Sequence, residues 1–344
     1  MVCAFPDRSE TLKQAFFAAG QVLKNEWGRF FNRDFLLGIA ISSSTLISVA
    51  LIPLIGSIII IFSPLPILFY YTKLGRVAGL AAVGITLGLV ISLLGLISPE
   101  KIFPLFFLIG LTGVFLAEAL KRGWTIEKTV AIPLLALLAV GAGFLTFHSF
   151  QSGQPPWQFV SAYIHNSIQE NIRIYGELNI SSDQINLIRD NAPQITRFLT
   201  WTFPAIVTAS TGICLWLNIL AAGPFFRSHG LHNPDFGDLT RWKAPEKIVW
   251  LLIAAGGILL IPQALVKFIG LNILIICLFI YLAEGISIIG FFLKVKKVPI
   301  LFRVMLYFLI LVQQYLLLLI VALGLFDLWA DFRKFIRPAA DPGV

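Results

Sequence analysis

Charged residues are scarce in this chain of 344 residues, in which Asp, Glu, Lys and Arg together make up 13%. Soluble domains contain about 25%. Hydrophobic residues make up 58%, the mean hydropathy is +0.86, and several apolar runs exceed the roughly 18 residues that cross a bilayer. The composition excludes an ordinary soluble domain. It predicts an all-α fold, a polytopic transmembrane helical bundle of about nine spans.

Cysteine is also rare. The three cysteines, Cys3, Cys214 and Cys277, form no C-x-x-C pair, and two of them fall within apolar runs. This pattern disfavours a disulfide, a structural zinc site and thiol chemistry.

Motifs of catalysis are missing as well, because no Walker A, HExxH, GxSxG or GxGxxG pattern occurs. One loop does hold two histidines and two aspartates (His229, His232, Asp235 and Asp238), but this spacing is more typical of a solvated loop than of a metal site. We therefore expect no enzyme activity, no catalytic residue, no cofactor and no metal.

Acidic residues are fewer than basic ones, which gives a net charge of +8. The basic residues gather in short loops between apolar runs, as the positive-inside rule requires of cytoplasmic loops. No Lys/Arg block is interleaved with aromatic residues. We therefore expect the lipid bilayer as a partner, no nucleic acid, and a cytoplasmic N-terminus.

The apolar segments predict nine spans, of which the second is a broken helix because it contains Ser63-Pro-Leu-Pro66. The spans are residues 35–52, 54–71, 77–97, 102–120, 130–150, 198–226, 248–268, 270–292 and 299–325.

Four of the segments outside the predicted spans are distinct parts of the chain. Residues 1–34 predict a cytoplasmic amphipathic helix, and residues 151–196 predict an outer hairpin of two helices with an apolar stripe. Residues 227–247 form a cytoplasmic loop, and residues 330–344 form a tail. Nine spans place this tail outside, although its basic residues favour the inside.

Polar side chains inside the spans are the candidate site, a polar cavity lined by Glu284, Asn218, Gln313 and Gln314. A carboxylate at mid-bilayer is expensive and is normally neutral, paired or functional. We expect a neutral Glu284 that is hydrogen-bonded to one of the three amides. The alternative is that these groups only fix helix packing through interhelical hydrogen bonds.

Several short patterns, in this order and spacing, resemble the YybS-like family of uncharacterised bacterial membrane proteins. The patterns are Pro64-Leu-Pro66 with Lys73-Leu-Gly75, Phe203-Pro204 with Leu217-Asn218, Asp238-Leu-x-x-Trp242-x-x-Pro245 with Trp250, Glu284-Gly285, and Gly324-x-x-Asp327-x-Trp329-x-Asp331-Phe-Arg333. The resemblance implies a multi-pass protein of the bacterial inner membrane.

That family is similar to the S components of energy-coupling-factor (ECF) transporters, six-helix proteins that bind vitamins or metals. The resemblance implies an S-component-like core at residues 35–226 and three added spans at residues 248–329. The usual Ala-x-x-x-Ala docking pair is Ala40-x-x-x-Ser44 here. The implied function is transport-related, as a small-solute binding subunit or carrier with a coupling partner. The alternative is a non-transporting scaffold that recruits envelope or cell-division proteins.

Overall fold

The computed structural model describes residues 32–94, 99–177, 182–232 and 234–335, and all regular secondary structure within these ranges is helical. Six of its helices are long and apolar enough to cross a membrane, or seven if one bent pair is counted as a span. The predicted all-α polytopic bundle is therefore confirmed. The predicted N-terminal amphipathic helix and the end of the tail lie outside the described residues.

The chain divides into two compact units. Unit 1 comprises Met1–Leu145 and Thr211–Asp235, and unit 2 comprises Thr146–Ser210 and Phe236–Val344. Residues 146–210, which the prediction assigns to a six-span core of residues 35–226, group with the C-terminal part of the chain in this division.

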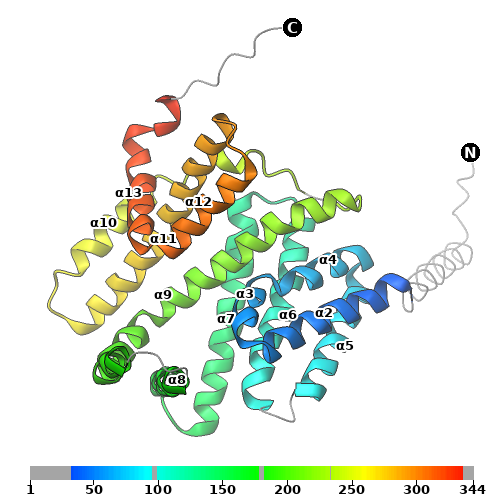
Figure 1. The fold of residues 1–344 in the computed structure, drawn as a ribbon, viewed down its shortest axis with the longest axis horizontal. Coiled ribbons are helices and arrows are strands. Elements are labelled where there is room, and N and C mark those ends of the chain that lie inside the picture. The colour runs from blue at the N-terminus through cyan, green and yellow to red at the C-terminus, as the bar shows by residue number, and fades with distance from the viewer. Residues whose placement is uncertain (1–31, 95–98, 178–181, 233, 336–344) are drawn as a thin grey trace, which may run out of the picture. The chain divides into compact units, whose positions relative to one another are not determined.

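Unit 1 contains the helices drawn in blue to cyan in Figure 1, most of α7 and the C-terminal part of α9. The helices are α2 (Arg33–Leu51), α3 (Pro53–Phe62), α4 (Pro64–Leu74), α5 (Arg76–Leu94), α6 (Pro99–Lys121) and α7 (Ile126–Ser152). Pro53 and Pro64 are the first residues of α3 and α4, a position at which the missing N–H does no harm. The predicted second span is accordingly two short helices.

The core of unit 1 is apolar, and its fully buried members include Leu46, Ile67, Val90 and Phe106. At Gly113, an added Cβ would lie 2.6 Å from Cγ2 of Ile67. The chain approaches there more closely than any residue but glycine permits. Such close approach is the usual basis of helix association in a membrane, where burial of apolar surface gives little driving force.

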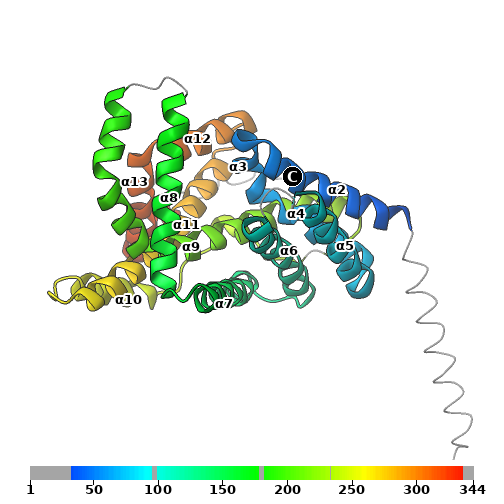
Figure 2. The same ribbon diagram turned by 90° about the horizontal axis from the view of Figure 1, so that it is seen from below.

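Unit 2 contains α8 (Pro156–Glu177), the first part of α9 (Ser182–Ser228), α10 (Ile248–Ile258), α11 (Ala264–Val295), α12 (Ile300–Val312) and α13 (Gln314–Ala330). Two short 3-10 helices, η1 (Leu239–Arg241) and η2 (Phe332–Phe335), complete it. Figure 2 shows α8 beside the first part of α9 as an antiparallel pair. Val160 and Ile172 of the predicted apolar stripe on α8 are buried.

Three of the predicted spans differ from the helices that the structure describes. The second helix of the hairpin and the sixth span form one helix of 47 residues, α9, because a change from polar to apolar residues does not by itself end a helix. The seventh span ends after 11 residues, at Ile258, since Gly256-Gly257 and Pro262 disfavour its continuation. The ninth span is the bent pair α12 and α13, whose axes differ by 102°.

Helices α11 and α13 pack against each other through glycine. A Cβ on Gly285 would lie 2.1 Å from the carbonyl oxygen of Ile320, and a Cβ on Gly324 would lie 2.1 Å from that of Tyr281. Neither position accepts a larger residue without separation of the helices. This contact fixes the place at which the charged residues of both helices meet.

Candidate functional site

A buried network of charged and polar groups joins the C-terminal halves of α11 and α13. Glu284 precedes the close-packed Gly285 on α11, and Asp327 lies one turn after Gly324 on α13. The exposed fraction of Glu284 is 4%, and that of Asp327 is 0%. Ionisable groups at such positions in a membrane protein are expensive and mark a functional interior by default.

Asp327 is held by the segment that follows its own helix. Asp331 adopts the left-handed conformation with φ of 44°, so that the chain turns back over the end of α13. As a result, Arg333 Nη1 donates to Asp327 Oδ2 at 2.9 Å, and the N–H of Phe332 donates to Oδ1 at 2.7 Å. Lys243 Nζ lies 3.7 Å from the same carboxylate. Asp327 is thus a fully paired buried charge.

The loop before α10 docks onto this pair. Arg333 Nη2 donates to the carbonyl of Trp242 at 2.9 Å, and the hydroxyl of Ser287 donates to the carbonyl of Leu239 at 2.7 Å. The N–H of Ala244 donates to Glu284 Oε2 at 3.3 Å. Backbone groups of an irregular loop therefore find their partners on α11 and η2, which is the condition under which such backbone is tolerated at membrane depth.

Two ion pairs close the rim of the network. Lys243 Nζ lies 2.9 Å from Asp331 Oδ1, and Lys294 Nζ lies 2.8 Å from Asp238 Oδ2. The hydrogen bond from Lys243 lowers the pKa of Asp331, and the one from Lys294 lowers the pKa of Asp238. Both carboxylates therefore stay ionised at neutral pH, and they tie the loop to α11 and to the turn after α13.

These contacts bear on the topology of the tail, which the nine predicted spans place outside and its basic residues inside. The loop predicted to be cytoplasmic, the end of α11 and Arg333 meet at one place. We therefore expect all three on one side of the membrane. Nine crossings would put them on opposite sides. The bent pair α12 and α13 explains the difference, because it leaves from the end of α11 and returns its own end to the same network.

Glu284 differs from Asp327 in having no cation. Arg333 is engaged by Asp327, Trp242 and Ser287, and no ion pair within 4.0 Å of the Glu284 carboxylate is present among the described residues. The Glu284 carboxylate accepts a hydrogen bond from a backbone N–H, that of Ala244. The expected partner was a side-chain amide, and the structure supplies the Ala244 peptide instead.

The other predicted members of the cavity lie elsewhere. Gln313 and Gln314 are exposed at the bend between α12 and α13. Asn218 is fully buried in unit 1, where its Nδ2 donates to the carbonyls of Ile61 and Cys214, both at 2.7 Å. The Ile61 carbonyl precedes the proline-rich break between α3 and α4, so Asn218 supports backbone that the helix itself does not satisfy.

A second asparagine has the same role in unit 2, and sequence reasoning missed it. Asn272 of α11 accepts a hydrogen bond from the N–H of Ala205 at 2.9 Å and donates to the carbonyl of Trp201 at 2.8 Å. These two backbone groups flank Pro204, which crowds the preceding turn of α9. An asparagine in an apolar helix opposite a proline of another span was the signal available.

Asp327, Ser287 and Arg333 were also missed as site residues. The aspartate and the arginine occur in the resemblance pattern Gly324-x-x-Asp327-x-Trp329-x-Asp331-Phe-Arg333, but we expected the tail to lie outside, away from the loop. The available signal was the presence of two aspartates and an arginine, Asp327, Asp331 and Arg333, at the end of an apolar helix.

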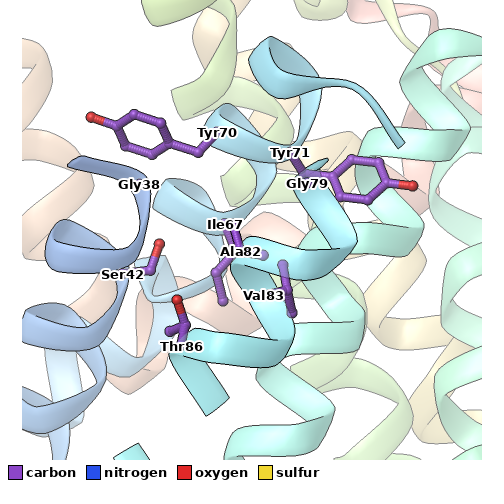
Figure 3. Close-up of a pocket in the computed structure, with 9 residues that line it drawn as sticks. All are labelled: Gly38, Ser42, Ile67, Tyr70, Tyr71, Gly79, Ala82, Val83 and Thr86. Carbon is purple, nitrogen blue, oxygen red and sulfur yellow. The ribbon is translucent and has the colours of Figure 1, made fainter. Parts of the chain in front are cut away.

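Unit 1 has a cavity between α2, α4 and α5 (Figure 3). Its volume of about 10 Å³ fits roughly one water molecule. The hydroxyls of Ser42 and Thr86 belong to its lining, whereas those of Tyr70 and Tyr71 point away from it in opposite directions. This cavity is too small to bind a solute.

The loop with two histidines forms no metal site in the described part of the chain, where no three His, Cys, Asp or Glu side chains come close enough together to hold an ion. His229 Nδ1 lies 3.0 Å from the hydroxyl of Ser228, and Asp238 is engaged by Lys294.

The family model described as "Predicted membrane protein (DUF2232)" matches residues 40–328. The match includes Glu284, Ser287 and Asp327 and ends just before the turn that carries Arg333. Neither a curated protein nor a solved structure matches the sequence.

Proposed function

Because the chain belongs to the DUF2232 family of predicted membrane proteins, we propose that it is a transport-related integral membrane protein, a small-solute binding subunit or carrier. The observation that supports the proposal is the buried network of Glu284, Asp327 and Arg333. Ionisable side chains are rare inside a membrane bundle, and they are typical of solute and ion pathways.

Broken helices favour the same function. The chain is interrupted between α3 and α4 in unit 1 and between α12 and α13 in unit 2. Discontinuous helices are a recurring feature of the binding regions of transporters. A bundle that only anchors a soluble domain has no need of them.

From the resemblance to S components of ECF transporters, we propose that the solute is a vitamin or a metal. For the same reason, we propose that transport requires a separate coupling partner. The proposal places the protein in the bacterial inner membrane with a cytoplasmic N-terminus. The loop of residues 236–247 then faces the cytoplasm, where its docking onto α11 closes the inner end of unit 2.

The test is a stability screen of the purified chain in nanodiscs against water-soluble vitamins and divalent metal ions. A solute at one hundred times its dissociation constant raises the free energy of unfolding by about 2.7 kcal/mol. We expect at least one solute to do so, and we expect a radiolabelled form of it to bind with a stoichiometry of one.

The test variant is Ser287→Ala, which removes the hydroxyl that holds the loop but leaves the charged groups in place. It should weaken the binding of the solute and leave the assembled protein intact. If no solute stabilises the chain, and envelope or cell-division proteins co-purify with it instead, the scaffold alternative replaces this proposal.

A further inference from the structure

The elbow between α11 and α12 carries three cations without an acidic partner. Lys296 and Lys297 are exposed, Arg303 is half-buried, and none of them forms an ion pair among the described residues. Their sequence neighbourhood explains this, because the chain has no Asp or Glu from residue 285 to residue 326. The nearby Lys294 is neutralised by Asp238.

A turn at Lys297 and one hydrogen bond bring Arg303 back to the chain that carries the two lysines. Lys297 has φ of 50°, a left-handed conformation that is unusual for lysine, and the N–H of Val298 donates back to the carbonyl of Leu293. Arg303 Nε donates to the carbonyl of Val298 at 2.7 Å, which folds the guanidinium back over the elbow. Arg303 therefore lies against the stretch of chain that carries Lys296 and Lys297.

An apolar surface begins at the same place. Ile300, Leu301 and Phe302, the first residues of α12, are 75%, 65% and 60% exposed. A ligand that fits both features has an anionic head and apolar tails. Neither a soluble phosphate nor a neutral lipid fits both.

We propose that the elbow formed by Lys296, Lys297 and Arg303 with the start of α12 is a binding site for one anionic phospholipid. The phosphate lies among the three cations, and the acyl chains lie along Ile300, Leu301 and Phe302. The occupant comes from the bilayer in which the chain resides, and the site goes beyond the proposed transport function because it does not depend on any solute.

The test compares lipid selectivity in the assembled protein. Wild-type protein in nanodiscs made of equal parts of phosphatidylglycerol and phosphatidylcholine is analysed by native mass spectrometry for the lipids it retains. We expect preferential retention of phosphatidylglycerol. The variant Lys296→Gln with Arg303→Gln should reduce this preference by roughly 25-fold, since each cation near the surface contributes about five-fold.

The matched control removes two exposed cations that have carboxylate partners, in the variant Arg173→Gln with Lys334→Gln. It should keep the preference. If the first variant does not assemble, Lys297→Asn is measured instead, because asparagine tolerates the left-handed conformation, and a loss of about five-fold is expected. An unchanged preference in the elbow variants overturns the proposal, and so does displacement of the lipid by millimolar inorganic phosphate, which would indicate a soluble anion.

Discussion

Replacement of Asn272 by leucine is expected to weaken unit 2 at the turn of α9 that contains Pro204. Both side chains branch at Cγ and leucine is the larger, so the change removes hydrogen bonds without leaving a cavity. Asn272 connects the N–H of Ala205 and the carbonyl of Trp201, at 2.9 and 2.8 Å, and Ala205 is fully buried. Both backbone groups lose this partner in the variant.

The magnitude has a lower and an upper bound. Interhelical hydrogen bonds in membrane proteins average about 0.6 kcal/mol, so two bonds give about 1.2 kcal/mol if the groups find each other across the turn. A buried donor or acceptor left unpaired costs about 1–3 kcal/mol. Since Pro204 prevents this turn from closing fully, we expect a loss of about 2 kcal/mol in the free energy of unfolding.

The assay is equilibrium unfolding in mixed micelles with increasing denaturing detergent. The matched control is Asn191→Leu, because Asn191 is exposed and donates only to the carbonyl of Leu187 in its own helix. It should change stability by less than about 0.5 kcal/mol. In a Pro204→Ala background, in which α9 closes its own turn, Asn272→Leu should cost less. An equal effect in both backgrounds, or equal effects of the two asparagine variants, refutes the reasoning.

Three further outcomes follow from the network in unit 2. Arg333→Gln should destabilise the protein by about 3 kcal/mol in the same unfolding assay, because it leaves the buried carboxylate of Asp327 without its main partner, and an effect below about 1 kcal/mol would contradict the buried pair. The pKa of Asp331 is lower in the folded protein than its value of about 3.9 in the unfolded chain. The ionised carboxylate therefore contributes stability above about pH 3.9, and this contribution is lost as the pH falls through the folded pKa. Asp331→Asn should therefore reduce the loss of stability on acidification, as measured by unfolding between pH 3 and 6. In a cysteine-free background, Lys334→Cys and Glu246→Cys should react with an impermeant thiol reagent from the same side of the membrane, and opposite sides would restore nine crossings.

Hydrophobic patterning predicted the helices of this protein better than it predicted their ends. The apolar runs that became α2, α5 and α11 are unbroken by proline, so their length alone identified them. The run of residues 248–268 is equally apolar, yet its glycine pair and Pro262 end α10 early. Composition shows which segments are apolar enough to lie in lipid. The end of a helix depends instead on where its backbone hydrogen bonds are interrupted.

Composition also does not predict the direction that a helix takes after a bend. Residues 299–325 contain enough apolar residues for one span, and nothing in them indicates the bend at Gln313. For the same reason, the tail was expected outside, and Arg333 was not connected with the loop. The connection depends on the left-handed conformation of Asp331, which sequence patterns seldom reveal because most such positions are glycine.

The position of Arg333 in the chain has a consequence for biogenesis. The loop that it holds begins at Asp238, 95 residues earlier. At about 5–20 residues per second, translation takes roughly 5–20 s to cover that distance. During this interval α11 inserts with Glu284 and Ser287, and the guanidinium that closes the network is still missing. Unit 2 therefore reaches its final form only after the ribosome has made nearly all of the described chain. A nascent protein stalled at α13 would offer both a free loop and an unpaired Asp327 to membrane quality control.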